Sequence, residues 1–337
     1  MTDEIIIAQH GHAGWITLNR PQALNALTHE MCLAIEHALD RWRDDADIAH
    51  VVIEGAGERA FCAGGDVVKL YEAGRAGEFA YGRKFWRDEY RLNAKIYHYP
   101  KPYIAFLQGF TMGGGVGISC HGSHRIVGES SRIAMPECGI GFVPDVGGSL
   151  LLARAAGHLG EYLGTTGARM QAGDAIYAGF ADHYIPEEYW PALKQNLQKK
   201  NVADAVSGCG KAAPESAMAG EQHRIDKFFA HAELSQIVGA LSSDGGEFSG
   251  NALKMLLRAS PLSAACALRI VREVRKEPSI ERALEWEYRF TSRATEFGDF
   301  LEGVRAAIID KDNNPRWRHA DRKDVPPGEI AGMLAKT

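Results

Sequence analysis

The 337-residue sequence has no long apolar run, no block of positive charge and no clustered cysteines. No apolar segment approaches the roughly 18 residues that a membrane-spanning helix needs, so we expect no membrane segment. The formal net charge of -5 and the pI near 6.2 provide no basic surface for a nucleic acid. The six cysteines are scattered without a short repeated spacing, which predicts reduced thiols rather than a disulfide framework or a zinc site. These absences disfavour membrane, nucleic-acid-binding and disulfide-rich proteins.

The N-terminal residues and the overall composition indicate a globular protein of the cytoplasm. Residues 1–7 carry Asp3 and Glu4 before only three isoleucines, a pattern typical of neither a secretory signal nor an Arg-rich transit peptide. The composition of 45% apolar and 24% charged residues is ordinary for a globular chain. We therefore expect a cytoplasmic protein with one large core or two domains.

Two glycine-rich loops are the most informative local feature. Residues 103–107 predict a buried strand, and the glycine-rich residues 109–119 predict a sharp turn that enters a helix. A similar glycine-rich loop lies at residues 60–67. Unpaired backbone N–H groups at such turns suit an anion or a developing oxyanion, although glycine also serves tight turns that have no such role. Two loops of this kind could supply two donors to one oxygen.

The order of predicted elements indicates an α/β fold with a helical C-terminal region. We expect two strands within residues 4–19, a helix over 29–44 capped by Thr28, and further strands at 50–54, 103–107 and 131–135. Connectors around an amphipathic helix at 222–241 are expected next, followed by helices at 251–259, 260–276 and 279–295. We therefore place an α/β core at residues 1–200 and a helical region at 201–337.

Three carboxylates stand in otherwise apolar surroundings. Glu137 and Asp145 lie eight residues apart in a glycine-rich passage, and a carboxyl group in such surroundings has a raised pKa that suits acid or base catalysis. Glu89 shares a predicted helix face with Phe85, Leu92 and Ile96, so it either is paired or points into a cavity. The structural alternatives are a buried salt bridge for Glu137, an N-cap for Asp145, and pairing of Glu89 with Arg87 or Arg91.

Several passages resemble the crotonase, or enoyl-CoA hydratase/isomerase, superfamily. The similar passages are residues 19–27, 60–67, 103–119, 133–148 and 298–306. This resemblance implies a spiral of ββα units with a C-terminal α-helical region, and a coenzyme A thioester as substrate. It also implies an oxyanion hole formed by the backbone N–H groups of Gly65 and Gly114. Coenzyme A contacts are implied at Ala23, Ala63, Asp66 and Val67.

Within that superfamily the sequence is most similar to the 3-hydroxyisobutyryl-CoA hydrolases. The similarity rests on residues 86–90, 135–137, 142–148 and 309–312. It implies that Glu137 and Asp145 are the reactive carboxylates, and that Glu89 and Gly114 contact the substrate with them. A hydratase has a second catalytic glutamate where this chain has Gly117, and usually has glycine where this chain has Asp145.

The resemblance implies hydrolysis of a short 3-hydroxyacyl-CoA, with 3-hydroxyisobutyryl-CoA of valine catabolism as the leading candidate. Two alternatives remain open: an enoyl-CoA hydratase or isomerase, and a noncatalytic protein that binds coenzyme A. No metal-ligand motif stands out and no cofactor is expected, because coenzyme A is part of the substrate. The superfamily often forms trimers or dimers of trimers, so a homo-oligomer is a further expectation, with contacts in the helical region. We expect no nucleic-acid or membrane partner.

Overall fold

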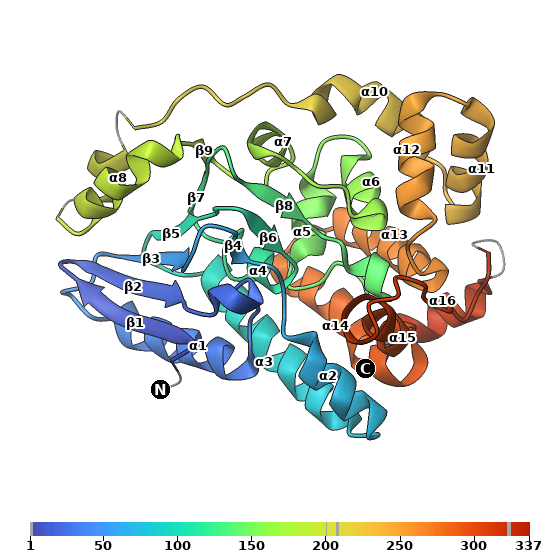
Figure 1. Ribbon diagram of the computed structural model, residues 1–337, viewed down its shortest axis with the longest axis horizontal. Helices are drawn as coiled ribbons and strands as arrows, with labels where there is room; N and C mark the ends of the chain where they lie inside the picture. The colour runs from blue at the N-terminus through green and yellow to red at the C-terminus, as the bar shows by residue number, and fades with distance from the viewer. Residues whose placement is uncertain (1–2, 200, 207–208, 322–324) are drawn as a thin grey trace. The chain divides into compact units, whose positions relative to one another are not determined.

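The computed structural model describes residues 3–199, 201–206, 209–321 and 325–337 (Figure 1). The chain forms two compact units, each built from three separate segments. Unit 1 comprises Met1–Gly65, Asp88–Ala134 and Met170–Ala219, and unit 2 comprises Asp66–Arg87, Met135–Arg169 and Gly220–Thr337. These interleaved units differ in their bounds from the expected α/β core at 1–200 and helical region at 201–337. The expected division into those two ranges stays a prediction.

Unit 1 is built on a six-stranded sheet in the order β1-β2-β3-β5-β7-β9 (Figure 1). Only β1 pairs antiparallel, with β2, and the following pairs of this sheet are parallel. The two strands expected within residues 4–19 are therefore confirmed as β1 and β2. The strands are β1 Ile5–His10, β2 Ala13–Leu18, β3 His50–Gly55, β5 Tyr103–Phe106, β7 His124–Val127 and β9 His183–Tyr184.

A second, three-stranded parallel sheet in unit 1 has the order β4-β6-β8. Its strands are β4 Ala60–Cys62, β6 Phe110–Met112 and β8 Arg132–Ala134. Each of them follows a strand of the larger sheet in the chain, so the pairs β3–β4, β5–β6 and β7–β8 repeat one unit. This arrangement confirms the expected spiral of ββα units, and it brings the two glycine-rich loops to the ends of neighbouring strands β4 and β6.

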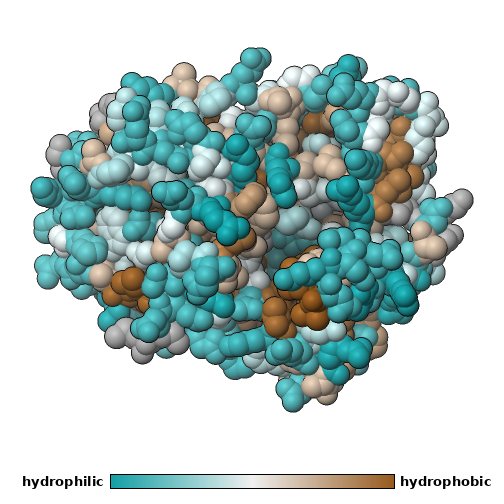
Figure 2. Space-filling view, viewed as in Figure 1, coloured by the Kyte–Doolittle hydropathy of each residue, from teal (hydrophilic) through white to brown (hydrophobic). Residues whose placement is uncertain are grey.

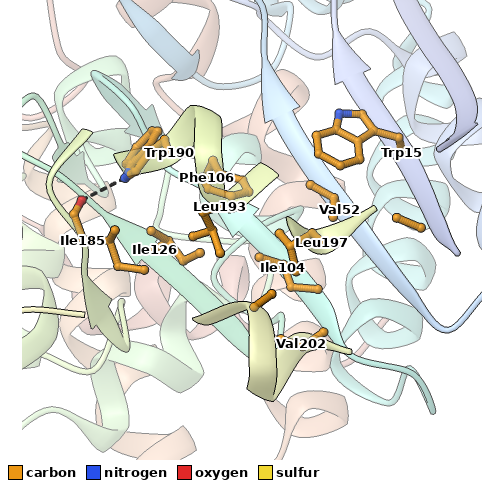
Figure 3. Packing of buried hydrophobic residues seen from close by; sticks show 12 residues of the cluster. Trp15, Val52, Ile104, Phe106, Ile126, Ile185, Trp190, Leu193, Leu197 and Val202 are labelled. Carbon is orange, nitrogen blue, oxygen red and sulfur yellow. Dashed lines mark hydrogen bonds between the residues drawn. The ribbon is translucent and has the colours of Figure 1, made fainter. Parts of the chain in front are cut away.

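The core of unit 1 lies between the large sheet and two short helices (Figure 3). Val52, Ile104 and Ile126 project from parallel strands and pack on Leu193 and Leu197 of α8. Trp190 joins this cluster and donates its indole N–H to the carbonyl oxygen of Ile185 at 2.8 Å. Burying these side chains stabilises the sheet by about 1.5–3 kcal/mol for each large one. The other elements of the unit are η1 Pro21–Ala23, α1 His29–Arg43, α4 Gly114–Gly117, α7 Ala172–Tyr177, η3 Glu187–Tyr189, α8 Trp190–Leu197 and α9 Val202–Val206.

Unit 2 contains no strand among its described residues and consists of helices and their connections. Helix α3 (Phe79–Tyr97) contributes residues to both units, and α10 (Ala217–Phe229) begins at the end of the last segment of unit 1. The remaining elements are α2 Val67–Arg75, η2 Glu137–Ile140, α5 Gly148–Arg154, α6 Leu159–Thr166, α11 Leu234–Asp244, α12 Glu247–Leu256, α13 Pro261–Arg275, α14 Ile280–Phe297, α15 Phe300–Val304, the π-helical turn η4 Arg305–Ile309, and α16 Pro327–Met333.

Three further features concern the surface, the cysteines and the length of the apolar helices. Hydrophilic residues dominate the face in Figure 2, and apolar residues appear there as separate patches. All six cysteines are free, and their redox state stays a prediction. Within the described part of the chain, no helix combines the length and the apolar character that crossing a bilayer requires.

Candidate active site

The two glycine-rich loops converge in unit 1. A Cβ atom placed on Gly114 would lie 3.4 Å from the backbone nitrogen of Gly65 and 2.9 Å from Oε1 of Glu89. Gly113, with φ +49°, turns the chain from β6 into α4, so that Gly114 begins the helix. In the described part of the chain, no backbone hydrogen bond is donated by the N–H of Gly65 or of Gly114. The fold therefore brings two candidate oxyanion donors and one carboxyl group together.

Glycine at position 64 lets the first loop pass close to the preceding segment. Gly64 has φ +113°, a conformation that L-residues with a Cβ rarely adopt. Its carbonyl accepts from Leu27 N at 2.9 Å, and Ala63 N donates to Leu24 O at 3.0 Å. Ala63 is thus fixed beside the turn that follows Ala23, which ends η1. Asp66 and Val67, at the start of α2, belong to unit 2, and the coenzyme A contacts expected at these four residues remain a prediction.

Glu89 is a buried carboxyl group that pairs with no cation among the described residues. Its side chain is 2% exposed, and Oε1 accepts no hydrogen bond from the described residues. Burial raises the pKa of Glu89 to about 8. The expected alternative of pairing with Arg87 or Arg91 is wrong, because Arg87 donates to the hydroxyl of Tyr288 and Arg91 donates to Glu36 and Asp88.

One turn further along α3, Asn93 is also buried without partners. It is fully inaccessible, and neither its amide nitrogen nor its amide oxygen makes a hydrogen bond with the described residues. Residues four apart share one face of a helix, so Asn93 follows Glu89 on the buried face of α3. Asn93 was not among the residues expected from the sequence, although its helical spacing from Glu89 would have singled it out.

Glu137 begins the 3-10 turn η2, directly after Met135 and Pro136. The turn is fixed by Phe142 N, which donates to Glu137 O at 3.0 Å, and by Ser260 N, which donates to Cys138 O at 2.9 Å. Oε2 of Glu137 is buried and has no partner among the described residues, and no salt bridge to Glu137 is seen there, so the salt-bridge alternative fails. Burial raises the pKa of Glu137 to about 8, and the charge of Glu287 adds to this rise.

Asp145 starts a tight turn in unit 2. Its carbonyl accepts from Gly148 N at 2.7 Å, and the two central residues, Val146 and Gly147, have φ of +54° and +78°. Such a pair of left-handed residues is typical of a type I′ turn. A β-branched residue in this conformation costs about 1–2 kcal/mol. Gly147, not Asp145, occupies the N-cap position of α5, so the N-cap alternative for Asp145 is wrong.

The same turn is held by a glutamate that was not expected from the sequence. Glu287 on α14 is fully buried and accepts hydrogen bonds from Gly147 N at 2.8 Å and from Ser149 N at 3.0 Å. The hydroxyl of Ser149 also donates to it. Glu287 shares a helix face with the buried Leu284 and Phe290, the same pattern of an acid on an apolar face that identified Glu89.

The predicted site residues therefore fall into two groups. Unit 1 brings Gly65, Gly114 and Glu89 together, and unit 2 holds Glu137 and Asp145 with Glu287. The first group can polarise a carbonyl oxygen through backbone N–H groups. The second group supplies carboxyl groups able to attack a carbonyl or move protons near neutral pH.

Comparison with known proteins identifies the family. The enoyl-CoA hydratase/isomerase family model matches residues 13–334. The mitochondrial 3-hydroxyisobutyryl-CoA hydrolase of Rattus norvegicus is 41% identical over 340 residues, which cover 98% of this chain and 88% of that protein. The Homo sapiens protein of the same name is 38% identical over 339 residues, covering 97% and 87%.

Solved structures agree on the fold. An enoyl-CoA hydratase from Rhodobacter sphaeroides 2.4.1 is 50% identical, with a TM-score of 0.95 and coverage of 99% of this chain and 97% of that one. A carnitinyl-CoA dehydratase from Mycobacterium thermoresistibile is 38% identical, with a TM-score of 0.96 and coverage of 100% and 97%. The expected crotonase fold is confirmed, and the chain belongs to the enoyl-CoA hydratase/isomerase family.

Proposed function

We propose that this protein hydrolyses 3-hydroxyisobutyryl-CoA to 3-hydroxyisobutyrate and free coenzyme A, a reaction of valine catabolism. The observation that carries the proposal is the pair of buried residues Glu137 and Asp145, of which Glu137 has a raised pKa and no cation partner among the described residues. The relatives named as 3-hydroxyisobutyryl-CoA hydrolases support it over nearly the whole chain.

In the proposed reaction, the N–H groups of Gly65 and Gly114 stabilise the oxyanion that forms when the thioester carbonyl is attacked. Glu137 either attacks this carbon to give a mixed anhydride with release of the thiolate, or takes a proton from the attacking water. Asp145 orients the water and passes a proton to the departing sulfur. One water is consumed, the C–S bond breaks, and an acid and a thiol result.

The substrate's 3-hydroxyl group is assigned to Glu89. In this proposal the buried carboxyl of Glu89, beside Gly114, accepts a hydrogen bond from that hydroxyl. An acyl group without the hydroxyl leaves Glu89 unpaired in a dry site and is therefore penalised.

The competing function is hydration of an enoyl-CoA, which the names of the solved neighbours suggest. Addition of water across a double bond by two glutamates needs a second carboxylate, and this chain has Gly117 where a hydratase has that glutamate. Gly117 has no side chain to supply it, so hydrolysis explains the residues better.

A thiol-release assay with 3-hydroxyisobutyryl-CoA and crotonyl-CoA tests the proposal. The wild-type protein should release thiol from the first substrate and leave the enoyl absorbance of the second unchanged. Glu137→Gln and Asp145→Asn should each lower kcat at least about 100-fold, because each removes a group that acts on the reacting atoms. Loss of enoyl absorbance without free thiol would establish the hydratase instead.

Heavy-oxygen water tests for the anhydride route. Under single-turnover conditions, label that enters the Glu137 side chain establishes the anhydride, because water has then attacked the Glu137 carbonyl carbon. Label confined to the free acid shows that water attacked the substrate's acyl carbon, which occurs in direct attack on the thioester and also when an anhydride opens at that carbon.

Assembly and location also belong to this proposal. We propose a trimer or a hexamer, which sedimentation of the purified protein would test. A cytoplasmic location stays a prediction, since the relatives are named as mitochondrial proteins. Fractionation of the source cells would decide between the two compartments.

A further inference from the structure

The turn that carries Asp145 does not hold its shape by local preference. Val146 is buried, β-branched and at φ +54°, and Gly147 follows at φ +78°. Backbone strain of this kind persists only where surrounding contacts impose the conformation. The 2.7 Å bond from Gly148 N to Asp145 O closes the turn from within, and a second set of contacts comes from outside it.

Those outside contacts come from one carboxylate, 138–140 residues away in the chain. Glu287 accepts from Gly147 N and Ser149 N, at 2.8 and 3.0 Å, and from the Ser149 hydroxyl. Hydrogen bonds to an ionised carboxylate are roughly twice as strong as neutral ones. Glu287 thus holds the backbone on both sides of Gly148, at Gly147 and Ser149, shortly after Asp145 in the chain.

Glu287 also acts on Glu137 electrostatically. Its charge raises the pKa of Glu137, and its own pKa is raised to about 7 by burial, against the three hydrogen bonds that lower it. On α14 itself, Arg289 pairs with Glu285. The charged groups on the helices packed against α14 are likewise paired with other groups or exposed. The paired ones are Arg154 of α5 with Pro278 O, Arg275 of α13 with Glu161, Glu302 of α15 with Arg305, and Glu329 of α16 with His319. The exposed ones are Lys69, Glu72 and Arg75 of α2.

We propose that Glu287 is a positioning residue for thioester hydrolysis: its carboxylate fixes the turn that presents Asp145, and its negative charge acts on Glu137. This inference rests on the proposed function. Glu287 does not touch the reacting atoms in this scheme. It sets the geometry of one reactive carboxylate and adds to the effect of burial on the other.

Two substitutions separate these effects. Glu287→Gln removes the charge and places an amide against N–H donors, so kcat should fall about tenfold or more with little change in KM. Glu137 then ionises more easily, so the acidic limb of the kcat/KM profile should move to lower pH. Glu287→Asp keeps the charge but is one methylene shorter, so kcat should fall while the acidic limb stays in place.

The matched control is Glu273→Gln on α13, a buried glutamate of the same unit that pairs with Arg269 and Lys276. It should leave both kcat and the acidic limb unchanged. A wild-type profile in Glu287→Gln, or an equal fall of kcat in Glu273→Gln, would refute the inference. Should Glu287→Gln fail to fold, Ser149→Ala removes one clamp donor, and an unaltered kcat there would refute the clamp.

A readout without substrate keeps this inference distinct from the proposed function. Infrared titration of the Glu137 carboxyl band, assigned by its loss in Glu137→Gln, should shift to lower pH in Glu287→Gln. If the wild-type protein releases no thiol, the proposed function fails. The titration still decides whether Glu287 acts on Glu137, and an unshifted band would refute that action.

Discussion

Two neighbouring acids on α3 differ because of their partners. Asp88 accepts from His29 at 2.8 Å and from Arg91 at 2.8 Å, so its charge is compensated. Glu89, the next residue, is buried beside Gly114 with a pKa raised to about 8. A carboxyl group without compensation is costly to bury, and such groups concentrate at functional sites. This contrast at single-residue scale makes Glu89, rather than Asp88, the candidate for substrate recognition.

Replacing Glu89 by alanine should reduce the ratio of kcat/KM for a 3-hydroxyacyl-CoA to kcat/KM for the same acyl-CoA without the hydroxyl group. At pH 9, above the pKa of Glu89, a hydrogen bond to the ionised carboxylate contributes about 1.5–3 kcal/mol, so kcat/KM for 3-hydroxyisobutyryl-CoA at that pH should fall roughly 10- to 150-fold. The value for isobutyryl-CoA should stay within a few fold, as thiol-release kinetics can measure. Asp88→Asn is the control and should preserve the ratio, whereas an equal loss with both substrates in Glu89→Ala would contradict the assigned role.

The sequence allowed some site residues to be predicted and hid others for a physical reason. Glu89 and Glu137 were identified from carboxylates in apolar local patterns, and both are buried with raised pKa values. The clamp of Glu287 on Gly147 could not be predicted, because a hydrogen bond across 140 residues depends on tertiary packing. Local spacing therefore indicates which side chains are unusual, and only the fold indicates what they contact.

Among the secondary-structure elements, the helix α4 shows how little space the glycine-rich loop leaves. Gly114 starts this helix without a left-handed φ, so alanine fits its backbone. An added Cβ, however, would meet Glu89 Oε1 at 2.9 Å and Gly65 N at 3.4 Å. A side chain at this position would thus displace the Glu89 carboxyl group and touch the Gly65 loop, whereas the turn itself does not need glycine.

Gly114→Ala should therefore impair catalysis more than folding. Alanine keeps the backbone N–H of residue 114, but its methyl group meets Glu89 Oε1 and touches the nitrogen of Gly65. An oxyanion donor shifted out of reach lowers kcat by up to about 10²–10³. Thiol-release kinetics and a thermal melt of the same sample would measure the two effects. Gly250→Ala in α12 is the control, because its Cβ would meet nothing within 4 Å. A Gly114→Ala protein with wild-type kcat would contradict the claim that the site has no room for a methyl group at this position.

Elements defined by local signals were predicted well, and those set by packing were not. Thr28 caps α1 as expected, accepting from Met31 N, and Pro261 starts α13. The single helix expected at 222–241 is instead two, α10 ending at Phe229 and α11 beginning at Leu234. The apolar positions change phase at this break. Continued as one helix, Leu234, Ile237 and Leu241 would lie roughly opposite Ile225, Phe228 and Phe229, so one straight helix could not bury both sets on one face.

For the stability of the protein as a whole, the buried carboxyl groups are a cost. The pKa values of Glu89 and Glu137 are raised to about 8 and that of Glu287 to about 7, above the ordinary 4.5. A group with a higher pKa in the folded state binds more protons there than in the unfolded chain. Its contribution to stability is complete below about pH 4.5 and is lost as pH rises through the folded-state pKa.

Glu137→Gln should therefore stabilise the protein although it lowers kcat at least about 100-fold. The amide never ionises, so the variant should unfold at a higher temperature than the wild type. The gap should grow from pH 5 to pH 8 and reach at least about 1 kcal/mol, because each tenfold difference in proton affinity between the folded and unfolded states corresponds to about 1.4 kcal/mol. Thermal melts across this range measure it, with Glu58→Gln at an exposed position as the control. A gap that stays constant or closes with rising pH would mean that Glu137 is not held in a dry site. A stabilising substitution at a catalytic residue is what a site built for reactivity at the expense of stability predicts.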